Sequence, residues 1–222
     1  MNAPTRAVVR MTRLVIGLAL YGLGAALTVA AGLGVDPWTV LAEGISRQTG
    51  IGVGWATNIL GALVLLAWIP LRQRPGLGTL LNVLLVGTSM QIALTVLPRP
   101  ADLAPRVALL AAGIALVALA SGVYLGADLG AGPRDGLMTG LRRRLGWPLW
   151  RARATVEITV LAAGWLLGGT VGAGTIAFAL AIGPLVGAAM RLLAGPASAT
   201  AHAGSAAAAI SAGGTRDAPP PV

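Results

Sequence analysis

Six polar side chains lie within or beside the apolar stretches of this sequence, and their types could bind a small polar molecule. They are three carboxylates and three amides: Glu157, Asp36, Asp135, Asn58, Asn82 and Gln91. In an apolar medium such a group is costly unless it is paired, hydrogen-bonded or in contact with water. We therefore take these six residues as the candidates for substrate binding.

Glu157 is the first of these candidates. It lies seven residues inside an apolar stretch that begins at residue 150, which is about 10 Å along a helix axis. Two interpretations are open. The carboxylate either lines a solvated path, or it forms a structural ion pair with Arg153, one helical turn earlier, or with Arg151.

The other five candidates also have a structural interpretation. Asp36 precedes Pro37, a pattern that predicts a helix N-cap. Asp135 falls in the first turn after Pro133, where a carboxylate favourably meets the positive end of a helix. The three amides are most simply explained by hydrogen bonds between helices, and a stripe of polar side chains facing a substrate is the alternative.

The residues that most enzymes use are missing. The chain has no cysteine, and its single histidine, His202, lies in a tail of alanine, serine and glycine. Disulfides and thiolate metal sites are thereby excluded. There is no nucleophile–base pair, Walker loop, HExxH motif or dinucleotide-binding fingerprint. We expect no enzyme activity, no metal and no cofactor.

The composition is that of a membrane protein. Of the 222 residues, 56% are hydrophobic and 10% are charged, and the mean hydropathy is +0.81. A soluble globular protein has about 25% charged residues, so this chain lacks the polar material to cover a surface in water. The net charge of +9 comes from arginines in short loops, which favours membrane orientation over nucleic-acid binding. The lipid bilayer is the expected partner.

Six stretches are long enough to cross a bilayer of about 30 Å as helices. They cover residues 13–33, 54–71, 78–97, 107–127, 150–169 and 173–193. Arginines gather before the first span and after the second, fourth and sixth, with six between Arg134 and Arg153. The other loops hold only Arg47, Arg99 and Arg106. This asymmetry predicts that both termini lie in the cytoplasm.

The sequence repeats itself after 96 residues. When residues 13–97 are overlaid on 109–193 without a gap, seven glycines coincide, together with Pro37 and Pro133. A chance overlay would match roughly two glycines, so duplication is the better explanation. Each repeat has three predicted spans, an odd number. The second repeat is therefore expected to be inverted relative to the first in the membrane.

This organisation divides the chain into five parts. A cytoplasmic N-terminus (1–12) precedes repeat 1 (13–97), an external linker (98–108) joins repeat 2 (109–193), and a disordered cytoplasmic tail (194–222) follows. The tail has too few large apolar side chains to pack. We expect an all-α membrane protein of six transmembrane helices in two inverted three-helix repeats.

Each repeat also contains one short helix, predicted at residues 37–48 and 133–145. Proline after Asp36 or Gly132 marks a helix start, and Gly50 and Gly146 mark the ends. About 12 residues are too few to span a bilayer. An amphipathic helix on the membrane interface is the favoured interpretation. A broken or re-entrant helix whose N-terminal amides face a cavity is the alternative.

The paired stretches carry a resemblance to a known family. The segments 32–46 and 68–82, echoed by 130–138 and 172–175, resemble the bacterial YczE/YitT-type integral membrane proteins. The resemblance covers roughly residues 10–195. The soluble C-terminal domain of many YitT proteins has no counterpart here, so the shorter YczE branch is the closer match. It implies a plasma-membrane protein and carries over no active-site residue.

Two functions are open at this point. The inverted repeats and Glu157 favour a small transporter or permease for a small-molecule substrate that the sequence does not identify. The alternative is a non-catalytic membrane partner that supports a secretion or biosynthetic complex, or that forms a homo-oligomer. A polar pocket where the repeats meet would favour transport. A dry interior with an exposed apolar groove would favour the partner role.

Overall fold

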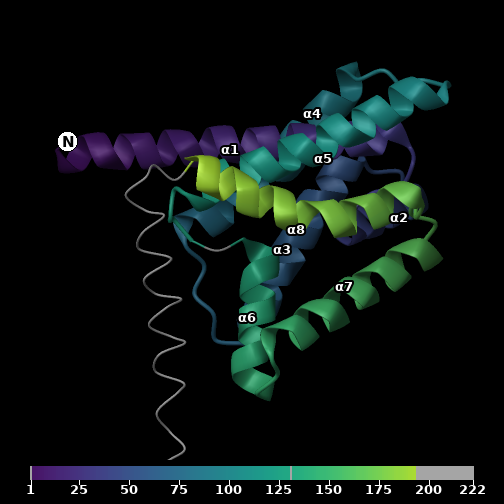
Figure 1. Cartoon of the computed structure of the whole chain (residues 1–222). Helices are drawn as coiled ribbons and strands as arrows, with labels where there is room; N and C mark the ends of the chain where they lie inside the picture. The colour runs from purple at the N-terminus through teal and green to yellow at the C-terminus, as the bar shows by residue number, and fades with distance from the viewer. Residues whose placement is uncertain (1, 131, 194–222) are drawn as a thin grey trace, which may run out of the picture.

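The structure, a computed structural model, describes residues 2–130 and 132–193, and within them it is built from helices alone (Figure 1). This confirms the all-α prediction. The helices follow one another as α1 (Ala3–Ala31), α2 (Pro37–Thr49), α3 (Val53–Trp68), α4 (Leu77–Val96), α5 (Leu103–Leu125), α6 (Pro133–Leu145), α7 (Leu149–Leu166) and α8 (Ala173–Leu193). The predicted tail from residue 194 onward lies outside the described residues.

The two short helices, α2 and α6, form where their sequence signals predict. The side chain of Asp36 accepts hydrogen bonds from two backbone N–H groups in the first turn of α2, which confirms the N-cap. Pro37 and Pro133 open their helices, where no N–H is needed. The helices stop before Gly50 and Gly146, whose φ values of 76° and 68° lie in the left-handed region that glycine enters without strain.

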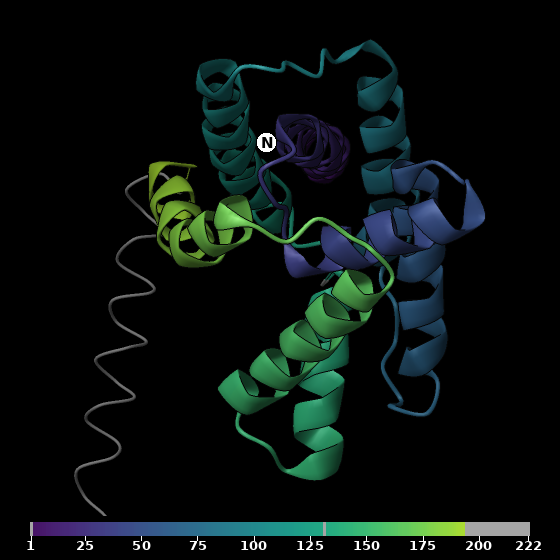
Figure 2. The same ribbon diagram turned by 90° about the vertical axis from the view of Figure 1, so that its right-hand side faces the viewer.

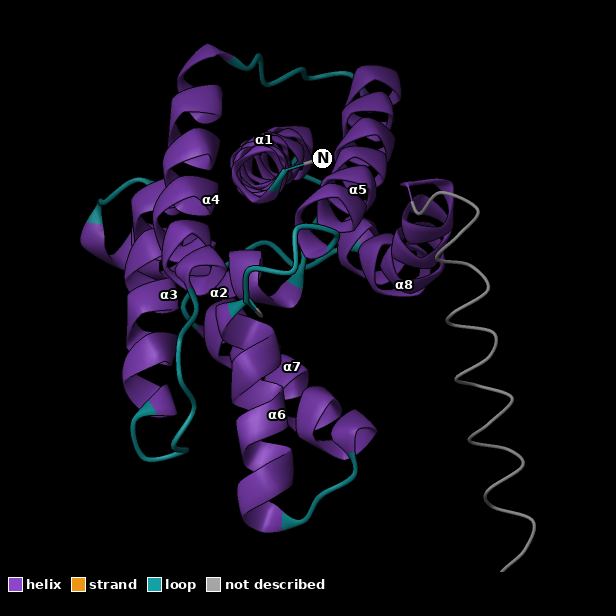
Figure 3. Ribbon diagram, turned by 90° about the vertical axis from the view of Figure 1, so that its left-hand side faces the viewer, coloured by secondary structure: helices purple, strands orange, loops and turns teal. Residues whose placement is uncertain are grey.

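Helix α1 is the centre of the molecule. It lies between α4 and α5, and α8 packs on α5, as the end-on views of α1 show (Figures 2 and 3). The remaining helices, α2, α3, α6 and α7, form a second group, which α3 joins to the first by packing along α4. In the second group α7 packs on α2, and α6 contacts both α3 and α7.

Small residues allow α1 and α5 to approach closely. A Cβ atom on Gly17 would stand 2.8 Å from the backbone nitrogen of Tyr124, and one on Gly24 would stand 2.9 Å from that of Val117. No side chain fits at such distances, so glycine is required where the helices cross. Apolar clusters fill the space on either side: Leu14, Leu18, Val86 and Ala127 on one, and Ala31, Leu110, Ile114, Val117 and Phe178 on the other.

The two repeats exchange hydrogen bonds at equivalent positions, 96 residues apart. Arg10 donates from Nε to the carbonyl oxygen of Ala127 at 2.7 Å, and Arg106 donates from Nε to that of Ala31 at 2.8 Å. A second N–H group of each arginine donates to the next carbonyl along the chain. Contacts that are reciprocal in this way relate two like units by a local two-fold axis.

The backbone shows the same exchange. The N–H of Gly78 donates to the carbonyl oxygen of Leu129 at 2.9 Å, and the N–H of Gly174 donates to that of Leu33 at 2.8 Å. The described residues with positive φ also fall into four equivalent pairs, and these are Gly32 with Asp128, Gly34 with Gly130, Gly50 with Gly146, and Arg72 with Gly168. The duplication seen in the sequence is therefore a duplication of local structure.

Fewer helices than predicted are suited to crossing a membrane. Helices α1, α4, α5 and α8 are long and apolar enough, and α2 with α3, bent by 114°, forms a fifth span if the bent pair counts as one. Helix α3 has only 16 residues, and α7 carries Arg151, Arg153 and Glu157 within its 18. The six-span arrangement therefore stays a prediction.

Candidate functional site

An ion pair between a buried carboxylate and a half-buried arginine joins the starts of the two short helices. Nη1 of Arg134, on α6, lies 3.1 Å from Oδ1 of Asp36, which caps α2. The Asp36 side chain is 8% exposed and that of Arg134 is 30% exposed. The two residues are 98 positions apart in the chain, so the tertiary fold alone brings them together.

The Asp36 carboxylate is saturated with hydrogen bonds. Oδ1 accepts from the backbone N–H of Trp38 at 3.2 Å and of Thr39 at 3.4 Å, in addition to Arg134. Oδ2 accepts from the Thr39 hydroxyl. These donors satisfy the hydrogen-bonding needs of the buried carboxylate. They fix it as a rigid anionic partner for the arginine.

Arg134 lies at the point where the repeats meet. Its guanidinium stands 5.1 Å from the centroid of the Trp38 ring, a cation–π distance. Trp38 and Arg134 occupy equivalent positions, 96 residues apart, so this contact pairs one position with its own counterpart. Besides Asp36, the arginine is attracted by the carboxylate of Glu157 on α7.

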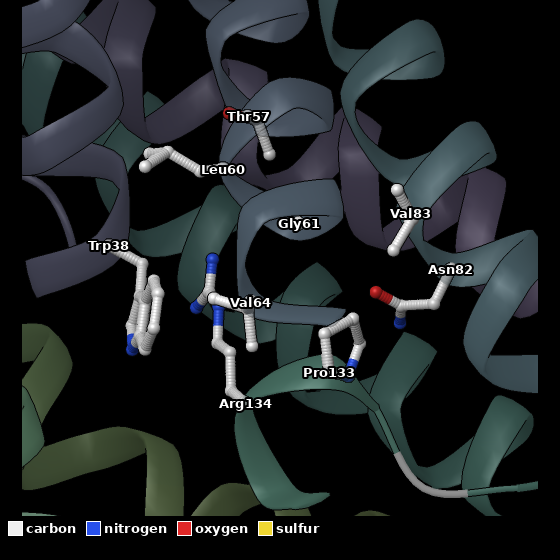
Figure 4. A pocket seen from close by; sticks show the side chains of 9 residues that line it. All are labelled: Trp38, Thr57, Leu60, Gly61, Val64, Asn82, Val83, Pro133 and Arg134. Carbon is white, nitrogen blue, oxygen red and sulfur yellow. The ribbon is translucent and has the colours of Figure 1, made fainter. Parts of the chain in front are cut away.

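A small pocket with a mainly apolar lining opens beside this pair. Figure 4 shows Arg134 and Trp38 on one side of it and Asn82, from α4, on the other. The remaining lining residues are Thr57, Leu60, Gly61, Val64, Val83 and Pro133. The volume open to water-sized molecules is about 40 Å³, room for about three waters. The pocket as it stands holds water or a very small solute.

Two polar atoms near these helices have no hydrogen-bond partner among the described residues. One is Nε1 of Trp38, a residue that is 5% exposed, and the other is Oδ1 of Asn58. A buried donor or acceptor without a partner costs about 1–3 kcal/mol. Such a cost is relieved when a ligand or a water supplies the missing partner. The Trp38 ring, which lines the pocket, therefore carries an unused donor.

The structure separates the predicted amides. Asn82 lines the pocket. Asn58 donates from Nδ2 to the Thr88 hydroxyl at 3.0 Å, and Gln91 accepts from the backbone N–H of Gly54 at 3.0 Å. Both of these amides join α3 to α4 as predicted for hydrogen bonds between helices. They do not line the pocket.

The two remaining acids lie on the second repeat. Asp135 is exposed in the first turn of α6, the position predicted for it. Glu157 is half-buried on α7. In the described part of the chain no arginine lies within 4.0 Å of Glu157, and Arg151 instead stacks on Trp147. The proposed ion pair of Glu157 with Arg153 or Arg151 is therefore not formed in this conformation.

Sequence reasoning missed two charged residues of the interior. The arginine count places Arg134 in a cytoplasmic loop, whereas the structure places it against Asp36. Glu43 is also buried, and its Oε2 accepts from the backbone N–H of Thr170 at 2.8 Å. The overlay of the repeats could have found Arg134, because it puts this residue opposite Trp38 at the two-fold axis. No comparable signal marks Glu43.

Known proteins resemble the chain over most of its length. Residues 8–191 match the model of a family described as a family of unknown function, DUF6198. An uncharacterized protein of Haemophilus influenzae is 42% identical over 173 residues, which are 78% of this chain and 79% of the relative. The uncharacterized membrane protein YczE of Bacillus subtilis is 34% identical over 178 residues, which are 79% and 83% of the two chains.

A third relative, the uncharacterized protein YyaS of Bacillus subtilis, is 27% identical over 165 residues, which are 72% of this chain and 82% of the relative. No solved structure matches. The family match and the YczE relative agree with the apolar helices described above. This chain is a membrane protein that belongs to the DUF6198 family and is of the YczE type.

Proposed function

We propose that this protein is a small permease that moves a small polar solute past the Asp36–Arg134 pair. The observation that carries the proposal is the ion pair itself, which joins the starts of two equivalent short helices inside an apolar chain. Removing an arginine and a carboxylate from water costs several kcal/mol for each ion. A helix cap needs only Asp36, so the half-buried arginine is best explained by a solute that it contacts.

The exchanged contacts support an inverted repeat. Two like units related by a two-fold axis, each with an odd number of spans, have opposite orientations in a bilayer, and the axis lies in the membrane plane. Arginines on one side of the predicted spans give the same orientation, with both termini in the cytoplasm. Solute sites in such proteins lie at the interface between the repeats, where this pocket lies.

The buried starts of α2 and α6 favour the broken-helix interpretation over the interfacial one. A helix lying on the membrane surface would expose its polar N-terminus to water. Here Asp36, Trp38 and Pro133 are buried, and α2 turns by 114° into α3. Irregular backbone at membrane depth is tolerated where it is enclosed by protein or lines a cavity. We therefore propose that α2 and α6 are broken helices that are enclosed by protein at membrane depth.

A partner role is the second candidate. It is favoured by the small volume of the pocket, about 40 Å³, and by the open face of α8, where Cβ atoms on Gly183 and Gly187 would meet nothing within 4 Å. Helices dock through such small-residue faces in membranes. In that case the Asp36–Arg134 pair would only fix the fold.

A binding screen distinguishes the two roles. The purified protein in detergent is heated in the presence of small-molecule pools, because a ligand of the native state raises its melting temperature. Solutes that shift the temperature are then tested for uptake into proteoliposomes. We expect Arg134→Gln to abolish both the shift and the uptake, and Arg74→Gln, in an exposed loop, to leave both unchanged. A ligand shift that survives in Arg134→Gln would refute the proposed site.

A further inference from the structure

The two repeats differ at one contact. In repeat 1, α3 packs along α4, whereas their equivalents α7 and α8 diverge from the turn that joins them (Figure 1). Helix α7 packs on α2 (Figure 2), a contact whose equivalent in the other repeat, α3 with α6, is also present. Two copies of one unit thus adopt two arrangements within the same chain. Each copy shows a conformation that the other could adopt.

The closed contact of repeat 1 depends on one small and one large residue. Gly54 on α3 presses against α4, and its N–H donates to Gln91 Oε1 at 3.0 Å. Next to it, Asn58 lies against Gly87 and donates to Thr88 at 3.0 Å. In the Gly54–Gln91 pair the small residue is on α3 and the long side chain is on α4.

In repeat 2 the small and the large residue are on the opposite helices. The equivalent of Gly54 is Trp150, on α7, which is 72% exposed. The equivalents of Gly87 and Gln91 are Gly183 and Gly187, on α8, and a Cβ atom on either would meet nothing within 4 Å. Here the large side chain is on α7 and the space is on α8. The pair is complementary, as in repeat 1.

We infer that the chain has a second, exchanged conformation in which α7 packs on α8, with Trp150 against Gly183 and Gly187, while α3 leaves α4. Lipid is as apolar as the exposed face of α8 and as the exposed Trp150 and Ile158 of α7, so burial of these groups gives little preference for either conformation. Helix packing alone then decides between two states that are close in free energy. In an inverted repeat the two states open toward opposite sides of the membrane.

This exchange also gives Glu157 a role. Its equivalent in repeat 1 is Gly61, which lines the pocket beside Arg134. In the exchanged conformation Glu157 would occupy the position of repeat 2 that is equivalent to Gly61, in a pocket where Arg134 takes the place that Trp38 holds here. Glu157 and Arg134 would then line the same pocket. The role given to Glu157 rests on the proposed function, whereas the exchanged conformation does not.

Cross-linking tests the exchanged conformation directly, because the natural chain has no cysteine. The variant Ala154→Cys with Pro184→Cys places thiols at the positions equivalent to Asn58 and Thr88, whose side chains meet across α3 and α4 at 3.0 Å, and it leaves Gly183 and Gly187 unchanged. A disulfide requires Cα atoms within roughly 7 Å, and α7 and α8 approach each other in this way only in the exchanged conformation. We expect copper phenanthroline to cross-link this pair several-fold faster than the control pair Thr155→Cys with Pro184→Cys. The control position is equivalent to Ile59, which faces outward.

The result that overturns the inference is a cross-linking rate equal to that of the control pair in a protein that melts normally. If the variant does not fold, spin labels at Thr159→Cys and Leu180→Cys, both exposed, serve instead. Two distance populations are expected for the labelled pair. A single population overturns the inference. In either assay Trp150→Ala should reduce the exchanged population several-fold.

The inference and the proposed function fail in different ways. If the disulfide forms but no solute shifts the melting temperature, the exchange stands and the transport role does not. If a solute is taken up while the disulfide never exceeds the control, the transport role stands and this exchange does not. If both hold, oxidation of the pair should stop uptake, and a reductant should restore it.

Discussion

Breaking the Asp36–Arg134 pair should measurably loosen the join between the two short helices. Removing one partner of a buried ion pair costs about 3–5 kcal/mol. Here Arg134 is 30% exposed, and Asp36 keeps its hydrogen bonds from Thr39 and the first turn of α2. We therefore expect Arg134→Gln to lower the free energy of unfolding by about 2–3 kcal/mol, below the range for a fully buried pair. For a chain of this size that is about 4–12 °C in melting temperature.

The matched control is the other ion pair among the described residues, between Arg10 and Asp128 at 3.6 Å. The Asp128 side chain is 98% exposed, and exposed pairs contribute little. Asp128→Asn should therefore melt within about 2 °C of the wild type. Asparagine also tolerates the positive φ at this position.

A double variant separates the pair from its parts. Asp36→Asn keeps an N-cap side chain but removes the charge, so Arg134→Gln with Asp36→Asn should be more stable than the sum of the single losses by about 0.5–3 kcal/mol. The assay is thermal unfolding in detergent, followed by circular dichroism. Strictly additive losses, or an Arg134→Gln variant as stable as the control, would refute the reasoning.

Three further outcomes are expected. Reporters fused to the C-terminal end and within residues 142–151 should read cytoplasmic and one at Asp102 external, whereas a cytoplasmic signal at Asp102 rules out inverted repeats. Glu157→Gln should abolish uptake and leave the melting temperature unchanged, because no ion pair forms there; a clear loss of stability would favour a structural role. Gly34→Ala should cost more stability than Gly50→Ala in the same melting assay. Both glycines have positive φ, but a Cβ on Gly34 would meet a backbone nitrogen at 2.6 Å and one on Gly50 meets nothing; equal losses would contradict this account.

The sequence by itself determined the elements and their duplication. The signals that start and end α2 and α6 lie within a few neighbouring residues, since an N-cap, a proline and a left-handed glycine act on the turn in which they stand. The offset of 96 residues can also be found in the sequence alone, because both copies need the same glycines at the same turns. Composition likewise determined the membrane class without any tertiary contact.

Only the tertiary structure decided which of the polar residues meet. Nothing near Arg134 in the sequence indicates that it reaches Asp36, 98 residues away, because that contact follows from the two-fold exchange of the repeats. Glu157 could pair with Arg153 by helical spacing alone, yet in the structure its attraction is to Arg134 first. The spacing of residues along one helix shows only which of its side chains can reach each other. The packing of α7 on α2 rather than on α8 decides what Glu157 faces, and that choice depends on helices far apart in the chain.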